Sequence, residues 1–124
     1  MTKPGVYFIV DVAITEGKIE EFKAIAAEMV VGTQNEPGAL AYEFYFDATQ
    51  RQCRLIEVYL NSEAALAHCN GPVVRELVPK LLTASTIVGF SVYGDLSNET
   101  AEILTQTGAK LFTTWQGFNR FSQS

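Results

Sequence analysis

The chain has 124 residues, 48% of them hydrophobic, and a formal net charge of −5 with a pI of about 4.8. This length and apolar content suit one domain with its own core. The acidic balance removes the usual electrostatic reason to bind nucleic acid or anionic lipid, so we expect small-molecule or protein partners, no nucleic acid and no membrane.

The expected location is cytoplasmic. The apolar stretch Val6 to Ile14 is interrupted by Asp11 and is too short to span a bilayer, and it lacks the basic start and cleavage site of a secretory signal. The two cysteines, Cys53 and Cys69, could form one disulfide, but a cytoplasmic setting favours free thiols.

The first half of the chain predicts a strand, a helix and a hairpin. Residues 6–15 alternate with the two-residue period of a strand. In residues 16–34, apolar residues recur at spacings of three and four positions, which predicts an amphipathic helix with Thr15 as its N-cap. Two runs rich in aromatic and β-branched residues, 39–47 and 52–60, predict an antiparallel hairpin.

The second half predicts a broken helix and a fourth strand. A short helix from residue 62 ends at Asn70-Gly71, and Pro72 begins a second helical piece, 73–82. Pro79 should bend or shorten that piece, because proline removes a backbone donor and crowds the preceding turn. Residues 86–93 alternate again.

The resulting order, β-α-β-β-α-β, is the ferredoxin-like arrangement of the α+β class, an antiparallel sheet with helices on one face. We assign this arrangement to residues 1–95. Residues 96–124 are predicted to be a helix-strand extension of the same domain, with a helix over 97–107 and a strand over 110–115.

The strands carry apolar residues on both sides, and the sequence leaves open which side meets the helices. The uncovered face then needs a second cover. The same face of another copy would provide it, which predicts a homodimer joined through the sheet faces.

Two polar residues on apolar surfaces are candidate catalytic groups. Glu57 shares one strand face with Leu55 and Tyr59, and a carboxylate there is costly to bury unless it is paired, so it is either an ion-pair partner or a functional group with a raised pKa. His68, the only histidine, could move a proton near neutral pH. A hydrogen-bonded structural role is the alternative for His68.

The surroundings of His68 favour a cavity over a metal site. At about 100° per residue, it shares a helix side with Ala64 and Ala65, and small residues there leave room between helix and sheet. Adjacent His68 and Cys69 diverge on a helix, while zinc commonly takes four ligands. We therefore expect no metal.

Aromatic residues on the strands are candidates for holding a substrate. Most such residues belong to the core, but a buried tyrosine hydroxyl needs a partner. The substrate-binding candidates are Tyr59, Tyr45, Tyr42 and Phe90. The chain has no glycine-rich phosphate loop and no nucleotide or flavin motif, so no cofactor is expected.

A set of short motifs is spread over the region from about Val6 to Tyr93. They are Glu36-Pro37-Gly38, Tyr42-Glu43-Phe44-Tyr45, Glu57-Val58-Tyr59, Ser62, Ala65, Ala67-His68 and Pro72. With these motifs the chain resembles the antibiotic biosynthesis monooxygenase (ABM) family of the dimeric α+β barrel superfamily. Tyr59 stands where a tryptophan is common in the family.

The resemblance implies a homodimer with one ligand pocket per subunit, between sheet and helices, and makes His68 and Tyr59 candidate pocket residues. Heme-degrading members place a histidine in the second helical piece, and residues 73–82 contain none. Heme is therefore disfavoured. Quinol oxidases of the family often have a second histidine just after the proline, where this chain has Val73.

The residues and the resemblance together favour a cofactor-independent monooxygenase that oxidises a small aromatic substrate, a quinol or polyphenol, with molecular oxygen. An electron-rich phenolate reacts with oxygen directly, so the protein need only deprotonate, orient and desolvate it. His68 would be the base or hydrogen-bond partner, Tyr59 and Tyr45 would hold the ring, and Glu57 would orient one of them.

Two alternatives stay open. In a non-enzymatic binding or structural dimer, His68 and Glu57 would be satisfied core groups. An isomerase of a small carbonyl compound would need an anion-binding group, such as Arg75 or Lys80, at the pocket mouth.

Overall fold

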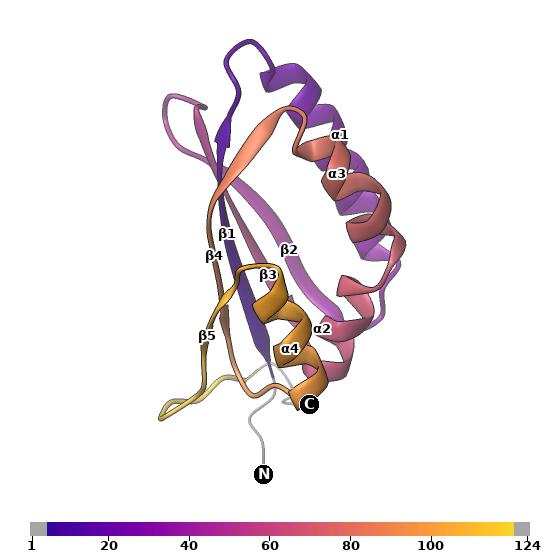
Figure 1. The fold of residues 1–124 in the computed structure, drawn as a ribbon, viewed down its shortest axis with the longest axis vertical. Coiled ribbons are helices and arrows are strands. Elements are labelled where there is room, and N and C mark those ends of the chain that lie inside the picture. Colours follow the sequence, from indigo (N-terminus) through magenta and orange to yellow (C-terminus); the bar gives the residue numbers. More distant parts are fainter. Residues whose placement is uncertain (1–4, 121–124) are drawn as a thin grey trace.

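The computed structural model describes residues 5–120; residues 1–4 and 121–124, the ends of the predicted domain and of its extension, lie outside the description. Figure 1 shows one sheet with helices along one face. The strands are β1 (Val6–Ile14), β2 (Ala39–Phe46), β3 (Gln52–Tyr59), β4 (Ser85–Tyr93) and β5 (Lys110–Phe112). The helices are α1 (Ile19–Gln34), α2 (Ser62–Cys69), the π-helical turn η1 (Val73–Leu77), α3 (Val78–Leu81) and α4 (Asn98–Gln106).

The sheet has the strand order β2-β3-β1-β4-β5. Strand β1 pairs antiparallel with β3 and β4, β2 pairs antiparallel with β3, and β5 is added parallel to β4. The predicted ferredoxin-like α+β fold with helices on one face, followed by an extra helix and strand, is confirmed. In the described part of the chain, each helix is too short or too polar to span a bilayer.

The start of α1 differs from the prediction. The helix begins at Ile19 rather than at residue 16, and Thr15 does not cap it. Gly17 has φ +81°, a left-handed conformation that a right-handed helix cannot contain. The N-cap is Lys18, which makes no side-chain capping bond.

The break in the helix follows the prediction, but the second helical piece begins with a π-helical turn, which is wider than an α-helical one. α2 ends at Cys69, and η1 begins directly after Pro72 as a π-helix. Pro79 lacks the N–H that would continue an α-helical ladder, and the widened turn lies immediately before it, where the ring would otherwise crowd the chain.

The helices pack on the face of the sheet that carries Glu57 and Tyr59. Two groups of buried residues form the core on this side. One lies under α1 and α3 and includes Phe22 and Met29, and the other lies near α2 and α4 and includes Phe8 and Leu104. The cavity described below is lined by residues of both groups.

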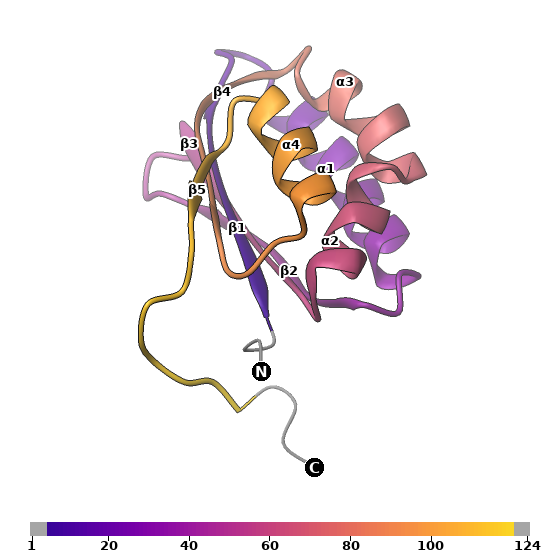
Figure 2. The same ribbon diagram turned by 60° about the horizontal axis from the view of Figure 1, so that its bottom comes forward.

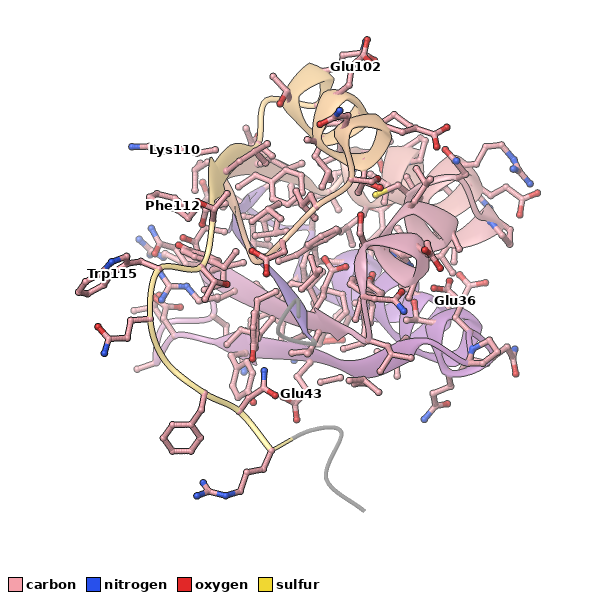
Figure 3. All side chains as sticks on the ribbon, turned by 90° about the horizontal axis from the view of Figure 1, so that it is seen from below. Glu36, Glu43, Glu102, Lys110, Phe112 and Trp115 are labelled. Carbon is pink, nitrogen blue, oxygen red and sulfur yellow. The ribbon has the colours of Figure 1, made fainter. Side chains whose placement is uncertain are left out.

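The opposite face of the sheet, called the open face here, has no helix over it (Figures 1 and 2). Its one described ion pair joins Arg54 to Asp11, with nitrogen–oxygen distances of 2.6 and 3.1 Å. Tyr93 and Phe112 stack with ring centroids 5.0 Å apart. Figure 3 places Phe112 and Trp115 on this side, and Trp115 is 91% exposed.

Gly38 sets the distance between the loop after α1 and helix α2. A Cβ at this position would lie 2.4 Å from the Ala64 Cβ, much closer than real carbon atoms approach. We expect Gly38→Ala to lower the free energy of unfolding by about 1–3 kcal/mol, because the helix must shift to relieve the overlap. Urea denaturation measures this change.

Gly89→Ala is the matched control, because the added Cβ would meet Asp11 at an ordinary contact distance of 3.6 Å. Equal stability losses for the two variants would show that the close approach at Gly38 does not matter.

Candidate active site

A cavity of about 200 Å³ lies between the sheet and the helices. Its lining is mostly apolar and comes from the four long strands and all five helical segments. The polar lining residues at its inner end are Tyr42, Glu57 and His68. This volume suits an aromatic ring, since an apolar cavity of about 150 Å³ holds benzene.

Glu57 is a buried carboxyl group on β3, only 4% exposed. The Tyr59 hydroxyl donates a hydrogen bond of 2.5 Å to its Oε1 atom. Burial raises the pKa of Glu57 to about 8, and the bond from Tyr59 offsets part of this effect. At neutral pH, Glu57 is therefore mainly a neutral acid that can donate a proton or a hydrogen bond.

His68 lies between two carboxyl groups and is 3% exposed. Its Nδ1 atom is 2.9 Å from Glu36 Oε1, and its Nε2 atom is 3.5 Å from Glu57 Oε1. Burial lowers the pKa of His68, while the hydrogen bond and charge of Glu36 act against that effect. A neutral imidazole that donates Nδ1–H to Glu36 keeps a lone pair on Nε2, so His68 can act as a base.

Helix α2 places His68 by packing very close to its neighbours. Asn61 caps the helix, its side chain accepting a bond of 2.9 Å from the Ala64 backbone N–H. Ala65 is fully buried, and Ala64 lies against Gly38. The expectation that these alanines leave room for the cavity is wrong: neither lines it, and they instead let α2 approach the sheet and the preceding loop.

Two tyrosine rings flank the imidazole. The ring centroids of Tyr59 and His68 are 5.0 Å apart, and those of Tyr42 and His68 are 5.6 Å apart. Burial raises the pKa of both tyrosines, so both hydroxyls stay protonated at neutral pH. The rings restrict the orientation of His68.

The structure brings most of the predicted site residues together. Glu57, His68, Tyr42 and Phe90 all line the cavity. Tyr59 lies outside the lining and supports Glu57 through its hydroxyl.

Tyr45 requires a correction. Side chains alternate along a strand, so Tyr45 points to the open face when its neighbour Phe44 points to the helices. It is 50% exposed, and its hydroxyl donates to Glu43. Tyr45 therefore cannot contact a ligand in this cavity.

Glu36 is a site residue that no sequence pattern predicted. It follows α1, and the sequence indicated it only as part of the motif Glu36-Pro37-Gly38 that carries the family resemblance. The segment Glu36-Pro37-Gly38 could have indicated this role, because Gly38 permits the contact that brings α2 and its histidine beside this loop. Figure 3 shows Glu36 on the helical side of the sheet.

The cysteines carry no evident chemistry. Cys53 and Cys69 are both free, and burial raises the pKa of each thiol to about 11, so neither is a thiolate at neutral pH. Across residues 5–120, no three histidine, cysteine, aspartate or glutamate residues are arranged to hold a metal ion.

Comparison with known families identifies the fold. The antibiotic biosynthesis monooxygenase model matches residues 5–80, more than half of the chain. The chain belongs to the antibiotic biosynthesis monooxygenase family. Glu36, Glu57, Tyr59 and His68 lie inside the segment that this ABM match covers, whereas α4 and β5 lie beyond it.

This ABM protein also resembles individual proteins. MupZ from Pseudomonas fluorescens has a similar crystal structure, with a TM-score of 0.80 and 27% identity over 97% of this chain and 98% of MupZ. A structure named antibiotic biosynthesis monooxygenase matches with a TM-score of 0.63 and 22% identity, covering 74% of this chain and 97% of that one.

An uncharacterised protein from Synechocystis is 32% identical over 71 residues, which are 56% of this chain and 48% of that protein. The chain thus spans about half the length of this curated relative.

Proposed function

We propose that this ABM protein is a monooxygenase that oxidises a small, uncharged aromatic substrate, a quinol or polyphenol, with molecular oxygen and no bound cofactor. One observation carries the proposal: the imidazole of His68 and the carboxyl group of Glu57 lie 3.5 Å apart at the inner end of an apolar cavity. Family membership supports the reaction class.

The proposed roles follow from the contacts. His68 accepts the phenolic proton on Nε2, because Glu36 occupies its Nδ1 atom. Glu57 donates a hydrogen bond to a second oxygen on the ring, and Tyr42 and Phe90 contact the ring itself. The apolar walls exclude water, which raises the reactivity of the phenolate toward oxygen.

The reaction balances without an added reductant. A hydroquinone and one O₂ give a hydroxyquinone and one water. The deprotonated ring transfers an electron to O₂, the two radicals combine as a C–O bond forms, and the resulting hydroperoxide loses water as its O–O bond breaks. The substrate supplies all four electrons that reduce O₂.

Oxygen uptake with a panel of hydroquinones under isotopically labelled O₂ tests the proposal. We expect uptake above the buffer rate and one labelled oxygen atom per product molecule. A protein that binds hydroquinones but never consumes oxygen would be a binding protein instead. The isomerase alternative has less support, because neither Arg75 nor Lys80 lines the cavity.

Glu36 is proposed as the positioning residue for His68. In Glu36→Gln the amide oxygen still accepts from Nδ1, but the negative charge that raises the pKa of His68 is lost. We expect kcat to fall roughly tenfold and the acid limb of the kcat pH profile to move to lower pH.

The matched control for Glu36 is Glu63→Gln, the same change on the exposed side of α2. A pH profile of Glu36→Gln that overlays that of the wild type would exclude the positioning role.

We also propose that two copies associate through their open faces. Ile9 and Ile56 are paired across β1 and β3 on this face, and the edge strands β2 and β5 carry Tyr45 and Phe112, whose aromatic side chains are 50% and 41% exposed. Such a surface favours association with a second apolar surface.

Ile56→Asp is expected to weaken the dimer at least a hundredfold, measured by sedimentation equilibrium, because a charge would be buried in the interface. Val31→Asp, on an exposed part of α1, should leave the dimer intact. A monomeric wild type, or equal effects of both variants, would rule out this interface.

A further inference from the structure

The cavity has a definite mouth, opposite its polar end. Of its lining residues, Leu82 and Ile87 are 41% and 42% exposed, and Thr107 is exposed as well, whereas Glu57 and His68 are almost fully buried. Leu82 directly follows α3, Ile87 lies in β4, and Thr107 directly follows α4. The cavity therefore opens between the ends of α3 and α4, over β4.

The strand register measures the path from the polar end to the mouth. Along β1, Phe8 is paired with Glu57, and Val12, four residues further on, is paired with Ile87. At about 3.4 Å per residue, the two rows are roughly 14 Å apart, longer than one aromatic ring. Val10 lies between them, paired with Leu55 and Phe90.

The path is lined by neutral and acidic side chains. Among residues 5–120, no lysine or arginine lines the cavity, and its inner end holds the carboxyl group of Glu57 beside the Glu36–His68 pair. An anionic group placed there would be desolvated without a partner, which is costly. The site thus fits a ligand with a neutral polar head.

Helix α4 closes one side of the path. Its Ile103 and Leu104 line the cavity, while Glu102 points away from the sheet (Figure 3). The start of the helix is tied to α2: the Ser97 backbone N–H donates to Ser62 Oγ at 2.9 Å, and the Thr100 hydroxyl donates to the Ser62 carbonyl oxygen at 3.4 Å. Val74 of η1 also lines the cavity, and π-helical turns often occur at functional sites.

The apolar rim indicates that a ligand continues through the mouth. Leu82 and Ile87 expose large apolar side chains at the opening, and a ligand wholly enclosed at the polar end would leave them without a partner. We propose that the substrate is a neutral amphipath: a polar ring held at Glu57 and His68, joined to an apolar chain that leaves the cavity between α3 and α4. The proposal rests on the proposed function for the role of the polar end.

A series of para-alkylphenols, from ethyl to octyl, tests the proposal by calorimetry under nitrogen. We expect the affinity to rise about fourfold for each added methylene, at least as far as hexyl. Para-alkylbenzoates of equal length should bind at least tenfold more weakly. An affinity that does not increase beyond ethyl overturns the apolar path, and equal binding of the benzoates overturns the neutral head.

Variants at the mouth locate the path. Leu82→Trp should weaken octylphenol binding at least tenfold and change ethylphenol binding less than twofold, because the larger side chain at the mouth blocks only the outer part of the cavity. Ile87→Asp should act in the same direction, and Val31→Trp, on exposed α1, should affect neither ligand. Equal losses for both ligands in both mouth variants would exclude a path between α3 and α4.

These measurements need no turnover. A chain-length dependence without oxygen uptake would keep the amphipathic ligand and remove the monooxygenase. Oxygen uptake without a chain-length dependence would keep the monooxygenase and remove the amphipathic ligand.

Discussion

Replacing His68 with glutamine is expected to lower the rate of oxygen uptake with hydroquinones by a factor on the order of a hundred to ten thousand. Glutamine can still hydrogen-bond within the site, but it cannot take up the phenolic proton. Because a neutral phenol reduces oxygen far more slowly than a phenolate, kcat should fall more than the affinity for the substrate. Steady-state oxygen uptake and equilibrium binding together measure this difference.

The control for His68→Gln is Ala67→Gln, which adds the same side chain at the adjacent, exposed position of α2. This variant should keep activity within about twofold of the wild type. Retained turnover in His68→Gln would remove the histidine from the reaction, and a matching loss of substrate binding would indicate a structural role.

Glu57→Gln is expected to change how stability depends on pH. The pKa of Glu57 is raised from 4.5 to about 8 in the folded protein, so the folded state holds this proton more tightly than the unfolded state. The stabilisation that protonated Glu57 gives the folded state is fully present below about pH 4.5 and is lost as pH rises through about 8. The free energy of unfolding then falls by at most about 1.4 kcal/mol per pH unit. Glutamine does not ionise, so the variant lacks this decrease in stability. It should therefore become more stable relative to the wild type as pH rises.

Urea unfolding between pH 5 and 9, at a fixed protein concentration, measures this effect. His68 acts in the opposite direction, since its pKa is lowered on folding: its contribution is present above about pH 6.5, its unfolded value, and is lost as pH falls. That dependence should persist in Glu57→Gln. Glu102→Gln, on the outer side of α4, should follow the wild type, and parallel curves for Glu57→Gln and the wild type would contradict the raised pKa.

Local sequence patterns determined most of the fold. The alternation in residues 6–14 and the apolar repeat in α1 each depend on one periodicity, so they could be recognised without knowledge of their partners. The break at Pro72 follows from the chemistry of proline. The start of α1 was misplaced because Gly17 adopts a left-handed conformation that glycine permits but does not require.

The candidate site was only partly accessible from the sequence. His68 and Glu57 stood out as lone polar residues on apolar surfaces, and the family resemblance pointed to the same histidine. Tyr45 was misassigned because a two-residue period separates the faces of a strand without saying which face the helices cover.

The sequence by itself determined the order of the elements, the family and the presence of two ionisable groups in apolar surroundings. The tertiary structure decided that Glu36 and Glu57, 21 positions apart in the chain, lie on either side of His68. It also decided that α4 closes the cavity and where the cavity opens. Periodicity is a property of one segment, whereas a pKa, a hydrogen-bond partner and a cavity mouth depend on how separate segments pack together.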